Sequence, residues 1–239
     1  MGIETRLVDY HLGSQRFEAY VALPERADRP RPAVLVSHAW SGRGEFECGK
    51  ARSLAELGYV GVALDNYGDA RVGGSPDENR GLMQPLLEDR GVLRARLLAG
   101  LAAARTLPEV DRDRIGAIGF CFGGLCAIDL ARSGADVRGV VSFHGLLDPP
   151  TGLDSRPIRA AVLVLNGNAD PWVKPEHVVA LARELTAAGV DWQLHDYGGV
   201  FHAFTNPAAQ SRESGALYDA RTDRRSWRSM CDFFAEKLA

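Results

Sequence analysis

The stretch Gly119-Phe120-Cys121-Phe122-Gly123-Gly124 decides the fold class of this chain of 239 residues. It follows a short apolar run, residues 115–118, and precedes a helical pattern, so a strand passes into a helix here. A nucleophile raised on such a tight turn needs small residues two places before and two places after it, because larger side chains would collide with the strand and the helix. Gly119 and Gly123 occupy these places around Cys121. We therefore predict a nucleophilic Cys121 rather than a cysteine that only packs in a glycine-rich turn.

Further apolar runs before and after this turn predict a parallel sheet. They lack polar alternation and are bounded by Gly, Pro or Asp, as in strands buried on both faces. Helical patterns alternate with them, so we expect an α/β fold with a mostly parallel sheet of about eight strands flanked by helices. The strands predicted in this way are residues 33–37, 60–64, 115–118, 137–143 and 160–165, whereas residues 191–197 alternate and predict the last strand. The predicted helices are residues 48–57, 81–107, 123–131, 175–188 and 212–238.

An N-terminal hairpin and one long loop complete the predicted organisation. Residues 7–12 and 16–23 flank Gly13-Ser14 and predict an N-terminal antiparallel hairpin at the sheet edge. Residues 67–78 are rich in Gly and predict a loop over the carboxyl edge of the sheet, because strand–helix alternation resumes after them. We find no repeat and no domain boundary, and we predict a single domain over residues 1–239.

The composition is typical of a globular protein that binds a small molecule. Hydrophobic residues make up 46% and charged residues 25%, which excludes a disordered or low-complexity chain. The 28 basic and 31 acidic side chains leave a net charge of -3, which provides no basic surface for nucleic acid or an anionic membrane. The longest apolar run, residues 160–165, is far shorter than a membrane helix. Residues 1–6 lack the pattern of a signal peptide, so we expect a cytoplasmic protein, whose oligomeric state stays open.

A nucleophilic Cys121 needs a base and a group that orients the base. This type of turn predicts the chain order nucleophile, acid, histidine. Asp170 lies just past the strand predicted at residues 160–165, at the edge where ligands meet open α/β sheets, and His202 follows the last predicted strand. Alone, Asp170 would be a turn residue and His202 an exposed loop residue. Together, at successive strand ends, they predict a Cys-His-Asp triad.

These features resemble the dienelactone hydrolase family of the α/β-hydrolase fold over nearly the whole chain. The resemblance implies a hydrolase of small esters or lactones that works through a thioester intermediate, with catalytic Cys121, His202 and Asp170 and no metal or organic cofactor. It also implies that the amides of Trp40 and Phe122 form the oxyanion hole. The similar segments are residues 119–124, Asn168-Ala169-Asp170-Pro171-Trp172-Val173, Gly199-Val200-Phe201-His202-Ala203-Phe204, His38-Ala39-Trp40-Ser41-Gly42 and Leu64-Asp65-Asn66-Tyr67-Gly68.

One departure from the family's pattern lies at Ala39, where the best-known members carry a Glu that contacts the resting cysteine. We hypothesise that Cys121 instead pairs with His202 as thiolate and imidazolium. The alternative is that Glu45 or Glu47 reaches the site from the adjoining loop.

A second departure concerns substrate binding. Where some members hold the substrate carboxylate with an Arg, this chain has Asn206, which offers hydrogen-bond donors but no charge. Arg71 or Arg80 is an alternative source of charge, although loop arginines are usually only solvated. The aromatic candidates for the wall of an apolar pocket are Trp40, Tyr67, Trp172 and Phe204.

The remaining cysteines and the strand-end histidines have structural explanations. Cys126 and Cys231 lie in apolar helical stretches and are expected to pack, and Cys48 opens a helix. His38 and His144 could face the pocket, although a His in such a place more often hydrogen-bonds backbone. We find no metal-ligand spacing of His, Cys and Asp.

Two other functions fit the same residues. The triad would also serve a thioester hydrolase or an acyltransferase. A non-catalytic small-molecule-binding protein could keep the fold, but it has no need of all three triad members. The natural substrate is not encoded in any motif of the chain.

Overall fold

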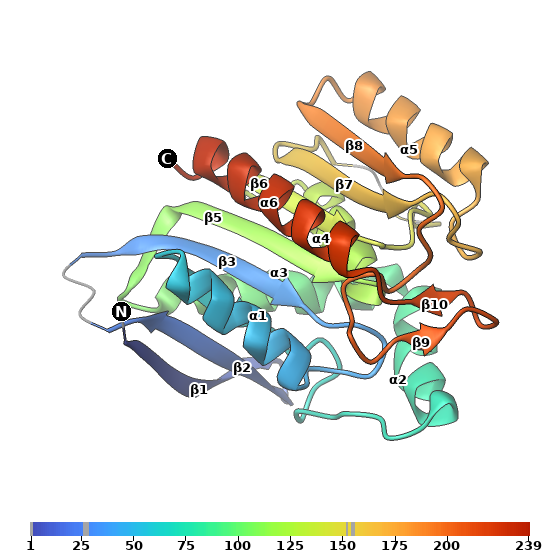
Figure 1. The fold of residues 1–239 in the computed structure, drawn as a ribbon. Helices are drawn as coiled ribbons and strands as arrows, with labels where there is room; N and C mark the ends of the chain where they lie inside the picture. Colours follow the sequence, from blue (N-terminus) through green and yellow to red (C-terminus); the bar gives the residue numbers. More distant parts are fainter. Residues whose placement is uncertain (1, 26–28, 152, 154–155) are drawn as a thin grey trace. The chain divides into compact units, whose positions relative to one another are not determined.

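The computed structural model describes residues 2–25, 29–151, 153 and 156–239 (Figure 1). The chain forms two compact units, residues 1–118 and 119–239. The single domain predicted over residues 1–239 stays a prediction. Met1, part of the segment that lacks a signal-peptide pattern, lies outside the described residues.

The first unit has the strand order β1-β2-β4-β3-β5. β1 and β2 form the predicted antiparallel hairpin, with Leu12 opposite Gln15. β2 pairs with β4 in antiparallel fashion, and β4 pairs with β3 in parallel. The elements are β1 (Ile3–Leu12), β2 (Gln15–Pro24), β3 (Arg31–Ser37), α1 (Glu45–Glu56), β4 (Val60–Ala63), α2 (Pro76–Glu88), α3 (Arg90–Thr106) and β5 (Val110–Phe120).

The second unit has the parallel strand order β6-β7-β8, and the carboxyl ends of these strands meet at one edge. A separate antiparallel hairpin, β9 with β10, precedes the last helix. The elements are α4 (Phe122–Arg132), β6 (Gly139–Phe143), β7 (Ala161–Gly167), α5 (Pro175–Ala187), β8 (Trp192–Tyr197), β9 (Gln210–Ser211), β10 (Ala216–Leu217) and α6 (Ala220–Lys237).

Burial explains why the strands show no polar alternation. Every residue of β4, β6 and β7 is buried, so both faces of these strands are apolar. Within the described ranges, five strands of the first unit and three of the second make up the eight that were predicted. The prediction of a mostly parallel α/β architecture with an N-terminal hairpin is confirmed.

Two predicted boundaries in the first unit are wrong because side-chain caps start helices there. The loop predicted at residues 67–78 ends early: α2 begins at Pro76, and the Ser75 hydroxyl accepts a hydrogen bond from the Glu78 amide. The helix predicted at residues 81–107 is two helices, since Asp89 ends α2 and caps α3 by accepting from the Val92 amide.

A third predicted boundary, in the second unit, is wrong in the same way. The helix predicted from residue 212 begins only at Ala220, where Asp219 accepts a hydrogen bond of 2.7 Å from the Thr222 amide. The residues before it form the β9–β10 hairpin, with Ala216 opposite Ser211. This hairpin bears directly on the candidate site.

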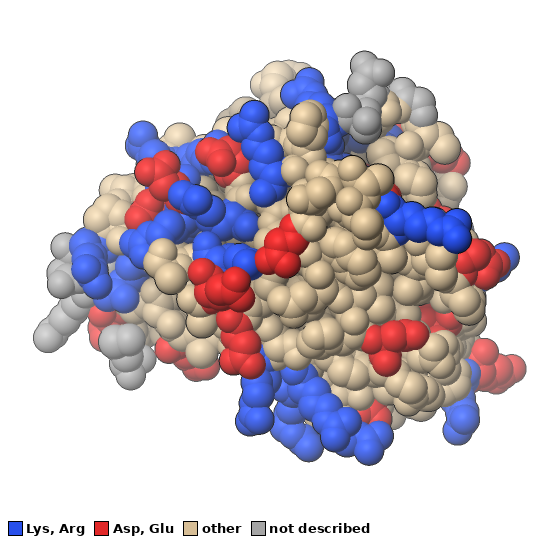
Figure 2. Space-filling view, turned by 90° about the horizontal axis from the view of Figure 1, so that it is seen from above, with Lys and Arg blue, Asp and Glu red and all other residues tan. Residues whose placement is uncertain are grey.

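The surface carries charges of both signs. Figure 2 shows Lys and Arg next to Asp and Glu over much of the face in view, which fits the small net charge of -3. Over the ranges that the structure describes, no helix has the length and apolar character to cross a membrane.

Candidate active site

Cys121 lies alone on the predicted strand-to-helix turn. β5 ends at Phe120 and α4 begins at Phe122, which leaves Cys121 with φ 57° and ψ −117°. A positive φ in a residue other than Gly costs on the order of 1–3 kcal/mol and persists only where neighbouring contacts enforce it. The backbone of Gly119 lies so close to that of Gly123 that only glycine fits, because a Cβ at Gly119 would lie 1.8 Å from the carbonyl oxygen of Gly123.

Backbone contacts enforce this conformation on both sides of Cys121. Its amide donates to the carbonyl oxygen of Phe143 and to Nδ1 of His144, each at 3.1 Å. Its carbonyl oxygen accepts from the Gly124 amide at 2.9 Å, within the first turn of α4. The side chain is half-buried, and the amides at the N-terminus of α4 follow it directly. Such amides stabilise negative charge, so the turn favours an anion at this place.

His202 and Asp170 form the buried acid–histidine pair that the chain order predicts. Nδ1 of His202 lies 2.6 Å from Oδ2 of Asp170, and both residues are buried. Oδ1 of Asp170 accepts a hydrogen bond of 2.9 Å from the Trp172 amide, so both carboxylate oxygens are engaged. This arrangement keeps a proton on Nδ1 and leaves Nε2 for proton exchange.

The pKa of His202 depends on both Cys121 and Asp170. Burial lowers this pKa, but the electrostatic interaction with Cys121, the hydrogen bond to Asp170 and weaker hydrogen bonding with Cys121 outweigh it, and the pKa rises from 6.5 to about 9. In the described part of the chain, Nε2 is buried without a hydrogen-bond partner of normal geometry. With a pKa of about 9, the His202 imidazole is protonated at neutral pH.

The β9–β10 hairpin holds the backbone of His202. The His202 amide donates to the carbonyl oxygen of Gly215, and the Leu217 amide donates to that of His202, both at 3.0 Å. Gly215 has φ +77°, and a Cβ there would lie 2.2 Å from the ring of Pro171, next to Asp170. The hairpin thus contacts the histidine segment and the acid loop together. The sequence pattern predicts a helix here, although Gly215 is a poor residue for a helix interior.

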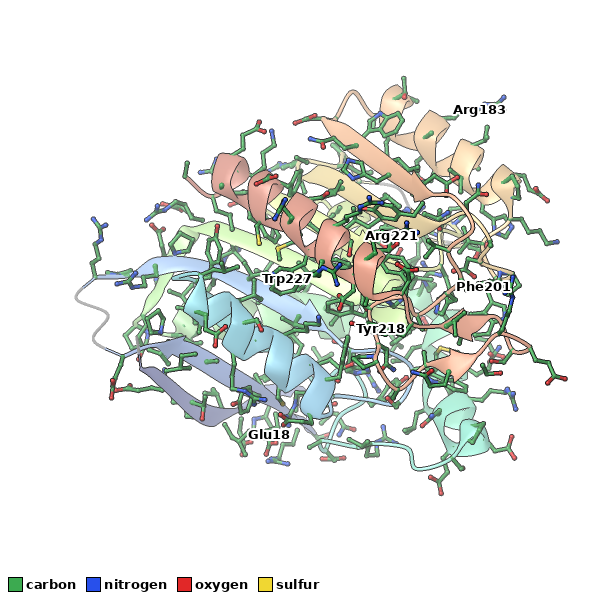
Figure 3. The ribbon with its side chains drawn as sticks, viewed as in Figure 1. Glu18, Arg183, Phe201, Tyr218, Arg221 and Trp227 are labelled. Atoms are coloured by element: carbon green, nitrogen blue, oxygen red, sulfur yellow. The ribbon has the colours of Figure 1, made fainter. Side chains whose placement is uncertain are left out.

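Figure 3 shows two aromatic residues at the ends of this segment, Phe201 beside the hairpin and Tyr218 before α6. The Arg212 guanidinium lies 5.3 Å from the centre of the Phe201 ring. The Tyr218 hydroxyl donates to Asp223 at 3.2 Å. These contacts attach the hairpin to its two neighbours, the histidine segment and α6.

Trp172 is the predicted pocket residue that the structure brings to the triad. Its ring lies 4.4 Å, centre to centre, from that of His202, and the residue is 46% exposed. An exposed aromatic ring against the catalytic candidate is suited to contact an apolar group of a substrate.

The other two candidates of the second unit have structural contacts. Phe204 is fully buried, with its ring 5.0 Å from that of His144, so it packs beneath the site. The side-chain oxygen of Asn206 accepts from the Ala208 amide at 3.0 Å and closes a turn. A direct contact of either residue with substrate stays a prediction.

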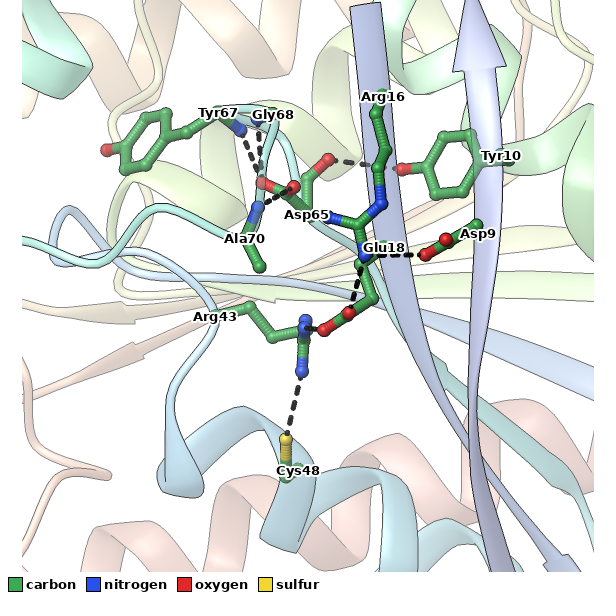
Figure 4. Close-up of polar contacts among 10 residues, drawn as sticks. All are labelled: Asp9, Tyr10, Arg16, Glu18, Arg43, Cys48, Asp65, Tyr67, Gly68 and Ala70. Atoms are coloured by element: carbon green, nitrogen blue, oxygen red, sulfur yellow. Dashed lines mark hydrogen bonds and ion pairs between the residues drawn. The ribbon is translucent and has the colours of Figure 1, made fainter.

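Asp65 organises the loop that holds the candidates Tyr67 and Arg71. Its carboxylate accepts from the amides of Tyr67, Gly68 and Ala70 at 2.9, 2.8 and 2.8 Å (Figure 4). The Arg71 guanidinium donates to the carbonyl oxygens of Tyr67 and Gly68. Arg71 therefore braces its own loop, and Tyr67 is buried beneath it.

Glu47 organises the neighbouring loop, which holds Ala39 and Trp40. Its carboxylate is buried and accepts from the amides of Ala39 at 3.1 Å and Gly44 at 2.9 Å. The Tyr67 hydroxyl donates to the carbonyl oxygen of Trp40 at 2.8 Å. The hypothesised contact of Glu47 with the cysteine and the role of the Trp40 amide in the oxyanion hole stay predictions.

The remaining charged candidates form surface pairs. Arg80 pairs with Asp77 at 3.0 Å, and both side chains are more than half exposed. Glu45 pairs with Arg52 and is likewise exposed. Neither pair is expected to contribute much to stability.

All four cysteines lie outside disulfide bonds. Cys126 is fully buried, and burial raises the pKa of the Cys48 and Cys231 thiols. The Arg43 guanidinium lies 3.7 Å from the Cys48 sulfur (Figure 4). In the described residues, no group of three or more His, Cys, Asp and Glu could hold a metal ion.

Comparison with known proteins assigns the family. The dienelactone hydrolase family matches residues 17–238. The chain belongs to the dienelactone hydrolase family. This dienelactone hydrolase family member is 38% identical to the solved structure "m3DLH", with full coverage of both chains and a TM-score of 0.95. It is equally identical, again with full coverage and with a TM-score of 0.96, to a dienelactone hydrolase-like promiscuous phosphotriesterase from metagenomic libraries.

A Bradyrhizobium relative described as a "probable 2-oxo-3-(5-oxofuran-2-ylidene)propanoate lactonase" is 30% identical over 215 residues, 82% of each chain. Together with the family match, these relatives identify an ester or lactone hydrolase of the α/β-hydrolase fold. The predicted family, fold and enzyme class are confirmed.

Proposed function

We propose that this hydrolase cleaves a small ester or lactone through Cys121, His202 and Asp170, with an acyl-cysteine intermediate. The observation that carries the proposal is the buried 2.6 Å contact between His202 and Asp170, with the charge of Cys121 acting on the same imidazole. A base oriented by an acid, beside a nucleophile on a strained turn, is the arrangement that acyl transfer needs.

In the first half of the reaction, the Cys121 thiolate attacks the carbonyl carbon and forms a C–S bond, while the carbonyl electron pair moves to oxygen. The Phe122 amide at the start of α4 is the proposed donor to this oxyanion, with Trp40 as the second predicted donor. Collapse of the intermediate breaks the bond to the alkoxide oxygen. That oxygen takes the proton from Nε2 of His202, which becomes neutral.

In the second half, neutral His202 takes a proton from water while the water oxygen attacks the acyl carbon. The second tetrahedral intermediate expels Cys121 as a thiolate, and the carboxylic acid leaves. His202 keeps the proton, so the thiolate–imidazolium pair is restored. Asp170 holds the imidazole in one orientation and stabilises its charge throughout.

We further propose a neutral substrate over a strongly anionic one. Asn206 stands where some relatives have an Arg, and its side-chain oxygen closes a turn. The Arg71 guanidinium is engaged by carbonyl oxygens of its own loop. A phosphotriester is the second candidate substrate class, since the metagenomic neighbour at 38% identity is described as acting on one.

The test compares Cys121→Ala with Cys231→Ala on a small activated ester, a neutral lactone, an anionic lactone and a phosphotriester. We expect Cys121→Ala to lose at least about 10³-fold in kcat, because the nucleophile is gone, and Cys231→Ala to keep its activity. Acid quenching should trap the acyl group on Cys121, detected by mass spectrometry. Undiminished turnover by a folded Cys121→Ala variant would refute the triad.

Two further measurements separate the rival functions. Added amine or thiol acceptors would divert the acyl group if the chain were a transferase. Iodoacetamide should alkylate Cys121 first, with parallel loss of activity, and uniformly slow alkylation of all four cysteines would favour a non-catalytic binding protein.

A further inference from the structure

His144 is a buried histidine that takes no part in the proposed reaction steps. It follows β6 directly, is 2% exposed and has φ 39°. Its amide donates to the carbonyl oxygen of Leu165 at 2.8 Å. Nδ1 of its ring lies 3.1 Å from the Cys121 amide nitrogen, and Nε2 lies 2.8 Å from the Thr205 hydroxyl.

These two contacts determine where the ring carries its proton. A backbone amide can only donate, so Nδ1 of His144 accepts and carries no hydrogen. The single proton of the neutral ring is then on Nε2 and is donated to the buried Thr205 hydroxyl. A proton on Nδ1 would face the N–H of Cys121 and break that hydrogen bond.

Nδ1 of His144 accepts its hydrogen bond from Cys121, the residue whose backbone is strained. The amide of Cys121 is shared between His144 and the carbonyl oxygen of Phe143, both at 3.1 Å. The carbonyl oxygen of Cys121 is held within α4. Because φ 57° persists only where such contacts enforce it, loss of one acceptor should let the turn relax and move the sulfur.

The ring of His144 also lies beside the catalytic imidazole. The ring centres of His144 and His202 are 5.0 Å apart, in an edge-on arrangement. Two uncharged rings also lie near His144, Phe120 at 6.1 Å and Phe204 at 5.0 Å. His202 has a carboxylate partner, Asp170, which stabilises a protonated imidazole there.

We infer that His144 is a positioning residue, which holds the Cys121 backbone through Nδ1 and stays neutral beside the protonated His202. This inference rests on the proposed function and extends it, since it assigns the geometry of the nucleophile to a side chain outside the triad.

The test uses three variants of the full-length enzyme and one matched control. His144→Leu removes the acceptor, and His144→Asn keeps one, because the amide oxygen of Asn can take the place of Nδ1. Thr205→Val removes only the Nε2 partner. His11→Leu makes the same change at an exposed position on β1.

We expect His144→Leu to lower kcat by about 100-fold with KM within about twofold, because a displaced nucleophile affects the chemical step more than binding. In His144→Leu, the Cys121 amide hydrogen should exchange with solvent faster than in the wild type, and iodoacetamide should alkylate Cys121 more slowly. His144→Asn should recover most of these losses. Thr205→Val should lose less than His144→Leu, and His11→Leu should match the wild type.

Unchanged kcat and alkylation in His144→Leu would overturn the inference. Equal losses in His144→Asn and His144→Leu would also overturn it, since ring packing would then matter and the acceptor would not. If His144→Leu does not fold, His144→Asn and Thr205→Val decide, because both keep an acceptor for the Cys121 amide. Both should then keep the amide exchange and the alkylation of Cys121 close to those of the wild type, and large losses in both would overturn the inference. Alkylation and exchange need no turnover, so a wild type that hydrolyses no ester would refute the proposed function and leave this test intact.

Discussion

In the proposed reaction, the charge of His202 sets the pH dependence. In the proposed steps its imidazolium form protonates the leaving alkoxide, and its pKa is about 9. Below that pH the donor is present, and above it the proton is lost. We therefore predict that kcat/KM for a neutral ester falls as pH rises through about 9. A profile between pH 6 and 10.5 checks this, and an alkaline limb centred near 6.5 would contradict it.

The same titration affects stability. The pKa of His202 is raised above its unfolded value of 6.5, so the folded state binds the proton more tightly. The resulting stabilisation is fully present below pH 6.5 and is lost as pH rises through about 9.

Trp172 provides an optical readout of this proton. Its ring lies 4.4 Å from that of His202, and an imidazolium quenches indole fluorescence more strongly than a neutral imidazole does. We predict a fluorescence increase as pH rises through about 9. Trp172→Phe is the control, because the other three tryptophans remain. A step of equal size in that variant would assign the change to another group.

Some site residues can be predicted from sequence and others cannot, for a physical reason. Cys121 has its glycines two places away, and Asp170 and His202 follow in a fixed chain order, so the local sequence is enough to predict them. His144 contacts Cys121 from 23 positions away, and that contact exists only after the strands pair. A buried histidine at a strand end has the same sequence pattern whether it holds a nucleophile or, like His38, two backbone groups.

At the scale of elements, the turn between β5 and α4 depends on the close approach at Gly119. A Cβ there would lie 1.8 Å from a backbone oxygen, which cannot move without displacing α4. We predict that Gly119→Ala lowers the free energy of unfolding by more than about 3 kcal/mol or prevents folding. Gly81→Ala is the control: it lies in α2 with nothing within 4 Å of an added Cβ, and should stabilise by about 0.5–1 kcal/mol. Urea unfolding measures both, and similar midpoints would contradict the prediction.

A change in the turn of the β9–β10 hairpin should displace the proposed triad residues His202 and Asp170. Gly215→Ala combines an unfavourable φ of +77° with a clash against Pro171, whereas Gly189→Ala has φ +67° and nothing within 4 Å. We predict that both lose about 1–2 kcal/mol of stability to backbone strain. Only Gly215→Ala should also lose activity, by roughly 10-fold or more in kcat, because its neighbours hold His202 and Asp170. Equal kcat values in the two variants would count against this role.

The ends of the helices were harder to predict than the strand interiors, because apolar spacing and capping residues indicate different boundaries. The leucine spacing of residues 93–105 favours one long helix, but Asp89 caps a new one. Ser75 and Asp219 are likewise capping residues, visible in the sequence, whose amide partners exist only once the helices form. Strand interiors were easier, since burial on both faces leaves uninterrupted apolar runs.

For the whole molecule, the unbroken strand–helix alternation predicts a single cooperative domain, although the chain forms two compact units. We predict one calorimetric transition, with equal calorimetric and van't Hoff enthalpies. Two resolved transitions would show that residues 1–118 and 119–239 unfold separately. The fold class is predictable at this scale because alternation and burial are properties of the entire chain, whereas the division into units depends on packing.

The outer end of the β9–β10 hairpin is the place where this enzyme can be extended. Residues 211–214 are exposed, and the turn is closed by its own Ser211 and Ser214. The contacts to His202 begin only at Gly215. Exposed loop tips tolerate insertions, so a peptide tag or fluorescent label spliced in at this tip should leave the fold intact. Such a label would sit within a few residues of Gly215, whose carbonyl oxygen accepts from the His202 amide, and would serve as a reporter of substrate binding at the proposed site.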